Sequence, residues 1–465
     1  MQIYNTLNRK KEEFIPQEDH KVKIYACGPT VYNYFHLGNA RPLVVFDTLR
    51  RYLEYQGYEV KFVQNFTDID DKVIQKANAE GKSIKEVSEF FIKQYYVDAD
   101  GLNVKRADVA PIATKHIDDM KKIIQTLIDK GYAYVANDGV YYRVNKFKDY
   151  LKLSRFNKDE LLENVRIDAK EDSGKENPAD FVLWKFKKPG EPAWEAPWGE
   201  GRPGWHLECS TMSMKYLGST LDIHCGGKDL IFPHHENEIA QSEAYSGKEF
   251  SRYWMHNGFI TVNDEKMSKS KHNFFLIREI ANKYGYMPIR LFLLNSHYRS
   301  PINYSIEMIE GSKSAYERLL NSYKNLKRAL KNPATDNSAD TKVKDFIKQS
   351  KAHFIKAMDD DLNTADALAA LFDLVKFSNK ELEAGLSKDS IEALISTFEE
   401  LSEVLGIKYE LETKIPDEVL DLVQKRQEAK DKKDYDAADA YRDKISDLGY
   451  KVIDTANGPE VEVKD

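Results

Sequence analysis

In the N-terminal part of the chain, short runs of hydrophobic residues alternate with amphipathic helical patterns. β-branched and aromatic residues dominate Val22–Cys27, and this run is followed by a loop at Gly28 and a helical pattern from about Gly38. A second run, Glu59–Gln64, leads through Asp70 into a charged helix. Two strand–helix units in succession predict an α/β fold built on a Rossmann-like, doubly wound parallel sheet.

The pattern changes between residues 107 and 203 and then returns. It predicts a helix over His116–Lys130 and a hairpin over Gly131–Val144, before a region rich in proline, glycine and tryptophan. The strand pattern resumes at Leu221–His224, and Pro233 stands at the favoured first-turn position of the next helix. We therefore expect an insertion to split the sheet domain.

Beyond Ser305 the chain is predicted to be helical almost throughout. Apolar residues recur there at three- and four-residue spacing, which is typical of a helix bundle. Asp359–Thr364 offers loop and N-cap residues between two of the helices. After Pro416 a charged helical hairpin is predicted, ending at Gly449 before a short strand-like segment. The periodic segments of the bundle are Ala315–Leu330, Phe346–Met358, Ala365–Phe377 and Ile391–Leu405.

These patterns divide the chain into several segments. A split sheet domain is followed by a linking region, an all-α helix bundle and a small C-terminal helical tail domain. The expected boundaries are 1–106 and 204–255 for the two halves of the sheet domain, 107–203 for the connective insertion, 256–304 for the linking region, 305–410 for the bundle and 411–465 for the tail.

Composition indicates a globular protein of more than one domain. Its 465 residues exceed what one hydrophobic core usually organises, and 42% hydrophobic with 31% charged residues leaves little room for long disorder. The N-terminus has no basic region followed by an apolar stretch, and no apolar run is long enough to span a bilayer. We therefore expect a cytoplasmic protein with no membrane contact. The net charge of −7 neither supports nor excludes an RNA partner, because phosphate binding needs only a local basic face.

The three cysteines, Cys27, Cys209 and Cys225, are too few and too scattered for a disulfide framework. Cys27 lies at a strand end, while His234 and Glu238 are four apart on a helix and share one face. Two thiolates from Cys27 and Cys209, an imidazole and a carboxylate are ligand types that zinc accepts. The alternative is that the two cysteines are small buried residues and that His234 and Glu238 form a helix-surface pair.

The segment His36–Asn39 lies where a strand and a loop deliver the chain to a helix N-terminus. Backbone N–H groups and the positive helix end favour polyphosphate there, and Gly38 leaves room for a flat base. His36 and Asn39 could donate hydrogen bonds to phosphate. Taken alone, this tetrapeptide is better explained as a histidine and an asparagine that cap a helix.

A second motif, Lys266–Ser270, follows the strand-like Phe259–Val262. Two lysines on a serine-containing loop can neutralise the charge that moves onto pyrophosphate when an α-phosphate is attacked. A solvated loop is again the simpler explanation of this segment alone. Both motifs occur in one split α/β domain, however, and in this combination the chain resembles the class I aminoacyl-tRNA synthetases.

The wider match is to one family within that class, the cysteinyl-tRNA synthetases. The similarity covers nearly the whole chain and rests on several long motifs. The segments that carry it are Cys27–Tyr32, Asn65–Lys72, Gly204–Ser210, Asp229–Asn237, Ala357–Thr364 and Asp436–Asp443.

The resemblance implies an enzyme that activates L-cysteine with ATP and transfers it from cysteinyl-adenylate to tRNA(Cys). It also implies a monomer in which the bundle and the tail bind tRNA on its anticodon side. It assigns one Zn²⁺ per chain, with Mg²⁺ accompanying ATP. Neighbouring His235 and Glu236 are not among the zinc positions that it assigns. Those positions are Cys27, Cys209, His234 and Glu238.

The resemblance implies roles for nine further positions. Each cysteine-pocket or ribose position also has a structural explanation, as a turn glycine, a helix cap, a core aromatic residue or a loop aspartate. The resemblance assigns catalysis to His36, Asn39, Lys266 and Lys269, ATP binding to these four with Gly38 and Asp229, and the cysteine pocket to Gly28, Thr67 and Trp205.

A metal at this place would solve a problem of selectivity. Cysteine and serine differ mainly in one atom, and an ordinary pocket separates such near-isosteres poorly. Coordination deprotonates a thiol outright, and soft sulfur outcompetes a hydroxyl as a zinc ligand. Discrimination of about ten-thousandfold needs roughly 5.5 kcal/mol, which is within reach of one metal–thiolate bond. We therefore expect no editing domain.

Two features depart from the family pattern, and two rival functions are compatible with parts of the chain. Cys225 stands where the family often has glycine, so we expect it to be a bystander, and the C-terminus lacks the tryptophan that frequently ends family members. One rival is an ATP-dependent ligase that passes cysteine to an amino sugar, but that type lacks the helical region beyond Ser305. The other is a non-catalytic tRNA-binding relative, which the intact motifs at His36 and Lys266 disfavour.

Overall fold

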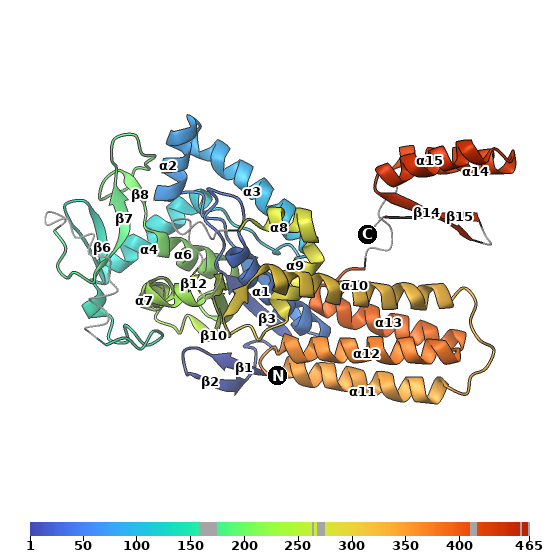
Figure 1. Cartoon of the computed structure of the whole chain (residues 1–465). Helices are drawn as coiled ribbons and strands as arrows, with labels where there is room; N and C mark the ends of the chain where they lie inside the picture. Colours follow the sequence, from blue (N-terminus) through green and yellow to red (C-terminus); the bar gives the residue numbers. More distant parts are fainter. Residues whose placement is uncertain (158–173, 263–264, 267–274, 410–415, 456–457, 464–465) are drawn as a thin grey trace. The chain divides into compact units, whose positions relative to one another are not determined.

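The fold was analysed in a computed structural model, which describes residues 1–157, 174–262, 265–266, 275–409, 416–455 and 458–463. The chain forms two compact units, Met1–Lys408 and Tyr409–Asp465. The first unit contains the sheet domain, the insertion and the helix bundle, and the second contains the tail (Figure 1).

A four-stranded parallel sheet forms the centre of the first unit, with strand order β10-β9-β3-β4. Hydrophobic residues of these strands are buried, which is typical of a parallel sheet covered on both faces. Two of the strands precede the insertion and two follow it, so the predicted split of the sheet domain is confirmed. The strands are β3 (Lys21–Ala26), β4 (Glu59–Gln64), β9 (Leu221–Gly227) and β10 (Ser251–Asn257).

Helices follow the strands as the sequence predicts. Asp70 caps α2 by accepting a hydrogen bond from the backbone N–H of Lys72. Phe232 is extended, and helical backbone begins at Pro233, three residues before α7. The helices of this region are α1 (Leu37–Tyr55), α2 (Asp71–Glu80), α3 (Ile84–Gly101), α6 (Trp205–Leu217) and α7 (Glu236–Ser246).

The insertion combines a helix with a small antiparallel sheet of order β5-β6-β7-β8. The predicted helix and hairpin are confirmed as α4 and the β5–β6 pair. The sequence pattern did not indicate the other two strands, which lie in the region rich in proline and tryptophan. The bounds are α4 (Ile117–Asp129), β5 (Ala133–Val135), β6 (Gly139–Tyr142), β7 (Phe181–Phe186) and β8 (Gly201–Pro203).

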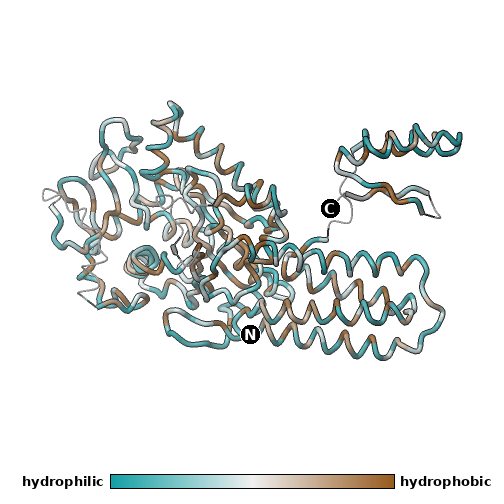
Figure 2. The backbone as a smooth tube through the Cα atoms, in the orientation of Figure 1, coloured by the Kyte–Doolittle hydropathy of each residue, from teal (hydrophilic) through white to brown (hydrophobic). Residues whose placement is uncertain are grey.

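The predicted helix bundle is also confirmed. Hydrophobic and hydrophilic positions alternate along each of its helices, and the hydrophobic ones are buried between them (Figure 2). Asn363 caps α12 by accepting from the backbone N–H of Asp366. The bundle helices are α10 (Ile306–Ala329), α11 (Asp340–Asp359), α12 (Thr364–Ala384) and α13 (Lys388–Leu405).

Smaller elements complete the fold. Between sheet domain and bundle lie the short strands of a sheet of order β12-β11-β13 and two helices, while β1 pairs with β2 near the N-terminus. The tail has its own small core around Val419, Val423 and Ile445, and it contains a β-hairpin whose second strand the sequence pattern did not indicate. The bounds are β1 (Gln2–Asn5), β2 (Lys10–Glu13), β11 (Ile260–Val262), β12 (Glu265–Lys266), α8 (Ile277–Tyr284), α9 (Tyr286–Leu294), β13 (Ile302–Tyr304), α14 (Asp417–Asp431), α15 (Tyr435–Asp447), β14 (Tyr450–Thr455) and β15 (Gly458–Val463).

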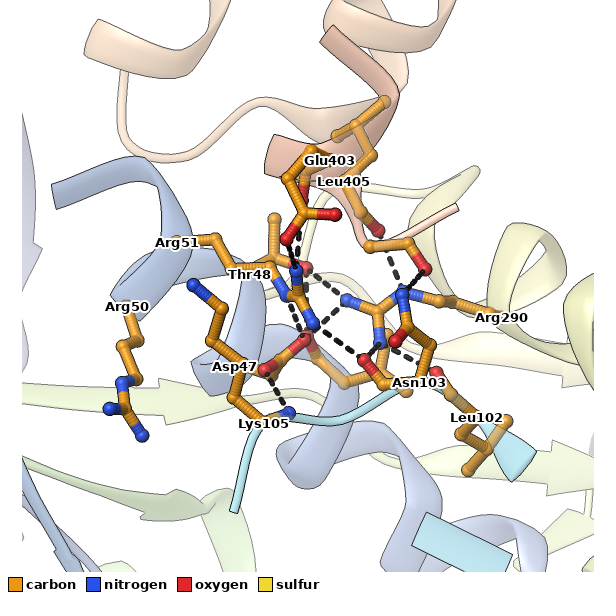
Figure 3. A network of polar contacts seen from close by, with 12 residues as sticks. Asp47, Thr48, Arg50, Arg51, Leu102, Asn103, Lys105, Arg290, Glu403 and Leu405 are labelled. Atoms are coloured by element: carbon orange, nitrogen blue, oxygen red, sulfur yellow. Dashed lines mark hydrogen bonds and ion pairs between the residues drawn. The ribbon is translucent and has the colours of Figure 1, made fainter. Parts of the chain in front are cut away.

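A buried ion-pair network joins the bundle to the sheet domain (Figure 3). Arg290 of α9 is fully buried and donates to the carboxylate of Asp47 in α1 (2.6 Å) and to the carbonyl of Leu405 at the end of α13 (2.6 Å). Arg51 binds the same Asp47 carboxylate and also pairs with Glu403. This network, which we call the Arg290 joint, fixes the end of α13 against α1.

The backbone at the joint is shaped around the guanidinium group. Gly406 has φ +66°, and a Cβ atom there would lie 2.1 Å from Nη2 of Arg290. Glycine is therefore required at this position both by its left-handed conformation and by the space that Arg290 occupies. The sequence analysis did not single out Arg290 or Gly406, because neither stands in a chemical motif.

Candidate active site and metal centre

A cleft opens at the carboxyl ends of the parallel strands, where ligands of doubly wound sheets usually bind. Its volume is about 450 Å³, and its walls come from the loop after β3, the start of α1, the end of β9 and the segment after β10. A cavity of this size fits a small-molecule substrate. The predicted site residues that line the cleft are Cys27, Gly28, His36, Gly38, Asn39, Trp205 and Asp229.

His36 and Asn39 stand together at the N-terminus of α1. His36 is the N-cap residue with extended backbone, and Oδ1 of Asn39 accepts from its backbone N–H (3.4 Å). The capping role that the sequence suggested is thus present. Both side chains also line the cleft, so the structure places the positive end of α1 and these two residues on one wall.

The second motif is only partly described. The backbone of Lys266 lies in β12, where it pairs with Thr261 of β11. Lys269 falls outside the residues that the structure describes. The roles assigned to these two lysines therefore stay predictions.

Gly28 and Thr67 shape the wall behind the loop that follows β3. A Cβ atom at Gly28 would lie 1.5 Å from the carbonyl oxygen of Asn65, so no side chain fits there. Thr67 is buried, and its hydroxyl donates to Glu208 (2.8 Å) rather than lining the cleft. Its backbone carbonyl accepts from Val31, which ties the loop to the segment after β4. Thr67 thus supports the cleft wall from behind.

Trp205 borders the cleft rather than the core. Its side chain is 40% exposed and stacks on the ring of His234, with 4.2 Å between ring centroids. The alternative interpretation of Trp205 as a core aromatic residue is therefore wrong. Asp229 lies in the turn after β9 and faces the same cleft.

The four predicted metal ligands come together behind the cleft wall, which one of them, Cys27, lines. One ligand atom from each of Cys27, Cys209, His234 and Glu238 lies within 4.8 Å of the others. Nε2 of His234 is 3.0 Å from Oε1 of Glu238, and Sγ of Cys27 is 3.5 Å from the same oxygen. Two sulfurs, one nitrogen and one oxygen around one point form a donor set that suits zinc.

A second set of donors overlaps the first. Cys27 and Glu238 also lie within 4.8 Å of His224 and His235. Nε2 of His224 is 2.9 Å from Oε2 of Glu238, and Nε2 of His235 is 3.3 Å from Sγ of Cys27. His224 was not among the predicted ligands, and the available signal was a histidine within a largely apolar buried strand, β9. Cys209 and His234 belong only to the first set, so variants of these two residues can separate the sets.

Electrostatics inside the cluster favour a bound cation. Burial raises the pKa of the Cys27 thiol well above its usual range, while the hydrogen bond with Cys27 lowers the pKa of Cys209 to about 6. Burial opposes ionisation of Glu238, but His224 and His234 lower its pKa to about 2. Burial likewise disfavours protonated His234, but Glu238 and Cys209 raise its pKa to about 10. With Cys209 and Glu238 ionised and His234 protonated, the cluster holds two negative charges against one positive charge, so a bound cation would compensate the remainder.

Cys225 belongs to neither donor set among the described residues. It is fully buried in β9, and its Sγ donates to the backbone carbonyl of Tyr25 (3.4 Å). Cys225 is therefore a residue packed within the sheet, which is consistent with the bystander role expected for it.

Replacing Cys225 by alanine is expected to leave the metal and the activity in place. The change removes one buried sulfur, so the free energy of unfolding should fall by roughly 1 kcal/mol. We expect metal content per chain to stay normal and the catalytic activity of the protein to stay within about twofold of the parent protein. Metal analysis of the purified variant checks this prediction, and a metal-free Cys225→Ala variant would contradict it.

Comparison with known proteins identifies relatives along the whole chain. Residues 13–314 match the family of class I tRNA synthetase (C) catalytic domains, and residues 353–410 match the DALR domain. The chain is 54% identical to the cysteine–tRNA ligase of Caldicellulosiruptor saccharolyticus over 465 residues, which is 99% of each chain. It is 51% identical to the cysteine–tRNA ligase of Clostridioides difficile over 98% of this chain and 99% of the relative.

Solved structures show the same fold at much lower sequence identity. The methionyl-tRNA synthetase of Mycobacterium tuberculosis in complex with methionyl-adenylate superposes with a TM-score of 0.61 at 18% identity, over 83% of this chain and 89% of that one. Among the described residues, every helix is too short or too polar to cross a bilayer.

Proposed function

The chain belongs to the cysteine–tRNA ligases, a family of class I aminoacyl-tRNA synthetases, and from this premise we propose how its residues carry out the reaction. The enzyme activates L-cysteine with ATP and attaches it to tRNA. The single observation that carries the assignment of residues is the buried donor cluster around Glu238, which reaches through Cys27 into the cleft that the N-terminus of α1 lines. The amino-sugar ligase is not favoured, because the match to cysteine–tRNA ligases extends over 99% of the chain.

The wall formed by α1 is the proposed ATP site. His36 and Asn39 would donate to the phosphates at the positive end of the helix, and Gly38 would leave space for the base. Asp229, which also lines the cleft, would accept from the ribose hydroxyls. Lys266 and Lys269 would complete the site by neutralising pyrophosphate, with Mg²⁺ bound to the triphosphate.

The donor cluster is the proposed cysteine-selecting site. We assign Zn²⁺ to Cys27, Cys209, His234 and Glu238, and the ion would supply a soft Lewis acid that prefers the thiolate of cysteine to the hydroxyl of serine. Trp205, which stacks on His234, holds that imidazole ring in place and covers it from the cleft side. Gly28 lets the loop after β3 pack directly against the backbone of Asn65, and the amino acid would lie beside this part of the cleft wall, next to the cluster.

Chemistry at the α-phosphate then needs positioning and charge stabilisation only. The cysteine carboxylate attacks the α-phosphorus in line, the bond to the bridging oxygen breaks, and pyrophosphate leaves. The terminal ribose hydroxyl of tRNA next attacks the acyl carbon, and AMP leaves with the electron pair. We assign no residue as general base, because donors at the α1 end and the lysines of the second motif stabilise the charge on the leaving groups.

Recognition of tRNA(Cys) is assigned to the helical region. We propose that the bundle at 305–410 and the tail at 411–465 contact the anticodon side of tRNA(Cys). The chemistry is assigned to the rest of the chain, which comprises the sheet domain at 1–106 and 204–255, its insertion at 107–203 and the linking region at 256–304. Unpaired anticodon bases are usually read by stacking and hydrogen bonds. We also propose that the enzyme is a monomer and that it is cytoplasmic.

Two assays on one preparation test the proposed function. The protein should catalyse cysteine-dependent ATP–pyrophosphate exchange and should charge purified tRNA(Cys), whereas serine should support neither reaction at comparable concentration. Zinc content measured on the same sample should be about one ion per chain. Pyrophosphate exchange without charging of tRNA would contradict the proposal, and so would equal use of serine.

Removing the tail should separate amino-acid activation from tRNA charging. The tail forms its own compact unit with its own core, and it contributes no residue to the described cleft. Deleting the chain from Pro416 onward should therefore leave pyrophosphate exchange within about twofold, while kcat/KM for aminoacylation should fall about tenfold or more, a loss of roughly 1.4 kcal/mol or more.

The truncated protein must first be shown to be folded, by its thermal unfolding and zinc content. If the folded truncated protein charges tRNA as efficiently as the full chain, the tail takes no part in tRNA recognition. A parallel loss of pyrophosphate exchange would contradict the division between activation and recognition.

A further inference from the structure

A second groove opens beside the active-site cleft. It has a volume of about 270 Å³ and is lined by Tyr32, Asn33, Lys72, Gln75 and Lys76. Tyr32, Asn33 and Lys72 also line the cleft, so the groove continues from the cleft toward the surface of α2. We call it the α2 groove.

The α2 groove combines an aromatic ring with an available cation. Nζ of Lys72 lies 5.5 Å from the ring centroid of Tyr32. Within the described parts of the chain, no carboxylate is within 4.0 Å of that ammonium group, and the adjacent Asp71 is instead bound by Lys185 and Arg202. Lys76, by contrast, pairs with Glu80 at 2.7 Å. Lys72 is therefore the cation of the groove that can accept an anionic partner.

Helix stability does not explain this lysine. Lys72 stands in the first turn of α2, next to the cap at Asp70. A positive side chain is unfavourable at a helix N-terminus, where the helix dipole favours acidic residues. Lys72 is exposed, and Gln75, which lies about one turn further along the same helix, also lines the groove. The arrangement points to a ligand rather than to a packing role.

In the second step of the reaction, tRNA must reach the cleft beside the α2 groove. The terminal ribose of tRNA must enter the cleft, and a double helix does not fit in a cavity of about 450 Å³. The end therefore has to arrive as a single strand that crosses the rim. Proteins hold single-stranded RNA by stacking bases on aromatic rings and by pairing phosphates with nearby cations. The α2 groove offers both features at a junction with the cleft.

We propose that the α2 groove binds the unpaired 3′-terminal nucleotides of tRNA(Cys) and guides the terminal ribose to the cysteinyl-adenylate. One base stacks on Tyr32, and the adjoining phosphate pairs with Lys72. The side-chain amides of Asn33 and Gln75 form hydrogen bonds with the edges of the bases. This inference rests on the proposed function, because it names the part of the tRNA substrate that the activating site receives.

The test compares two tRNAs and three single variants. Lys72→Gln should bind full-length tRNA(Cys) about tenfold more weakly, because it loses one phosphate contact, and the slope of log Kd against log salt should fall by about one. The same variant should bind a tRNA(Cys) that lacks its unpaired 3′ nucleotides as well as the parent protein does. Lys72→Arg should restore most of the affinity. Tyr32→Leu should show the same selective loss without the change in salt dependence.

Lys85→Gln is the matched control. Lys85 is an exposed lysine of α3 that pairs with Glu89 at 3.8 Å and lines neither the cleft nor the α2 groove. Its replacement should leave the binding of both tRNAs unchanged. Thermal unfolding of every variant should match that of the parent protein.

Three results would overturn the inference. Equal weakening of both tRNAs in Lys72→Gln would place the contact on the double-stranded part of tRNA. Undiminished binding together with lost pyrophosphate exchange would assign Lys72 to ATP. Unchanged binding and unchanged exchange would leave the groove without a role. None of these results bears on whether the parent protein charges tRNA(Cys), so failure of the groove and failure of the proposed function are distinguishable.

Discussion

Replacing Cys209 by serine is expected to remove most of the bound zinc and most of the activity. The change takes away one of two sulfur donors, and the serine hydroxyl is not ionised at neutral pH and is a poor zinc ligand. Zinc content should fall from about one ion per chain to a small fraction. Cysteine-dependent pyrophosphate exchange should fall by about a hundredfold or more, because replacing even a residue that only supports a ligand commonly costs 10- to 100-fold.

Three variants make this experiment decisive. Cys225→Ala removes a buried sulfur from the neighbouring strand without touching either donor set, so it controls for the loss of a thiol as such. His234→Asn should behave like Cys209→Ser. His235→Asn should keep the metal if the assigned set is right. Normal zinc in Cys209→Ser together with lost zinc in His235→Asn would transfer the site to Cys27, His224, His235 and Glu238.

Replacing Arg290 by alanine is expected to destabilise the first compact unit by about 3–5 kcal/mol, the range observed when one partner of a buried ion pair is removed. The change leaves the Asp47 carboxylate with Arg51 and the backbone N–H of Lys105 as donors, and it leaves the carbonyls of Leu102 and Leu405 without the donors that Arg290 supplies. It also opens a cavity against Gly406. The thermal midpoint should fall by several degrees or more, and activity should be lost at temperatures where the parent protein is stable.

An exposed ion pair of the bundle provides the comparison. Lys327 of α10 pairs with Glu399 of α13 at 3.1 Å, and its side chain is partly exposed. Lys327→Ala should reduce the free energy of unfolding by about 1 kcal/mol or less, because solvent screens such pairs. If Arg290→Ala is no more destabilising than Lys327→Ala, the Arg290 joint does not contribute to stability as proposed.

Local patterns were enough to predict most of the secondary structure. Glu59–Gln64 is a strand with the predicted bounds, and the helix pattern of the bundle is confirmed because the periodicity of buried positions is a local property. Segments without such periodicity were missed. Strands β7 and β8 lie among prolines, glycines and tryptophans, and they pair through partners that only the folded insertion provides.

The candidate site shows the same division between local and tertiary information. The sequence by itself determined that His234 and Glu238 share a helical face, because four residues make about one turn. It also determined that His36 and Asn39 stand at a helix start. Only the tertiary structure decided that Cys27 and Cys209 meet that face, since this depends on β9 lying between β3 and β10 and on α6 packing beside the sheet.

Other features had no sequence signal at all. The burial of Arg290 against Asp47 and the continuity of the α2 groove with the cleft follow from how distant segments pack. A single arginine or lysine carries no periodicity, and its partner is chosen by three-dimensional proximity. Residue chemistry and local spacing thus determined which groups the protein possesses, whereas strand order and helix packing decided which of them meet.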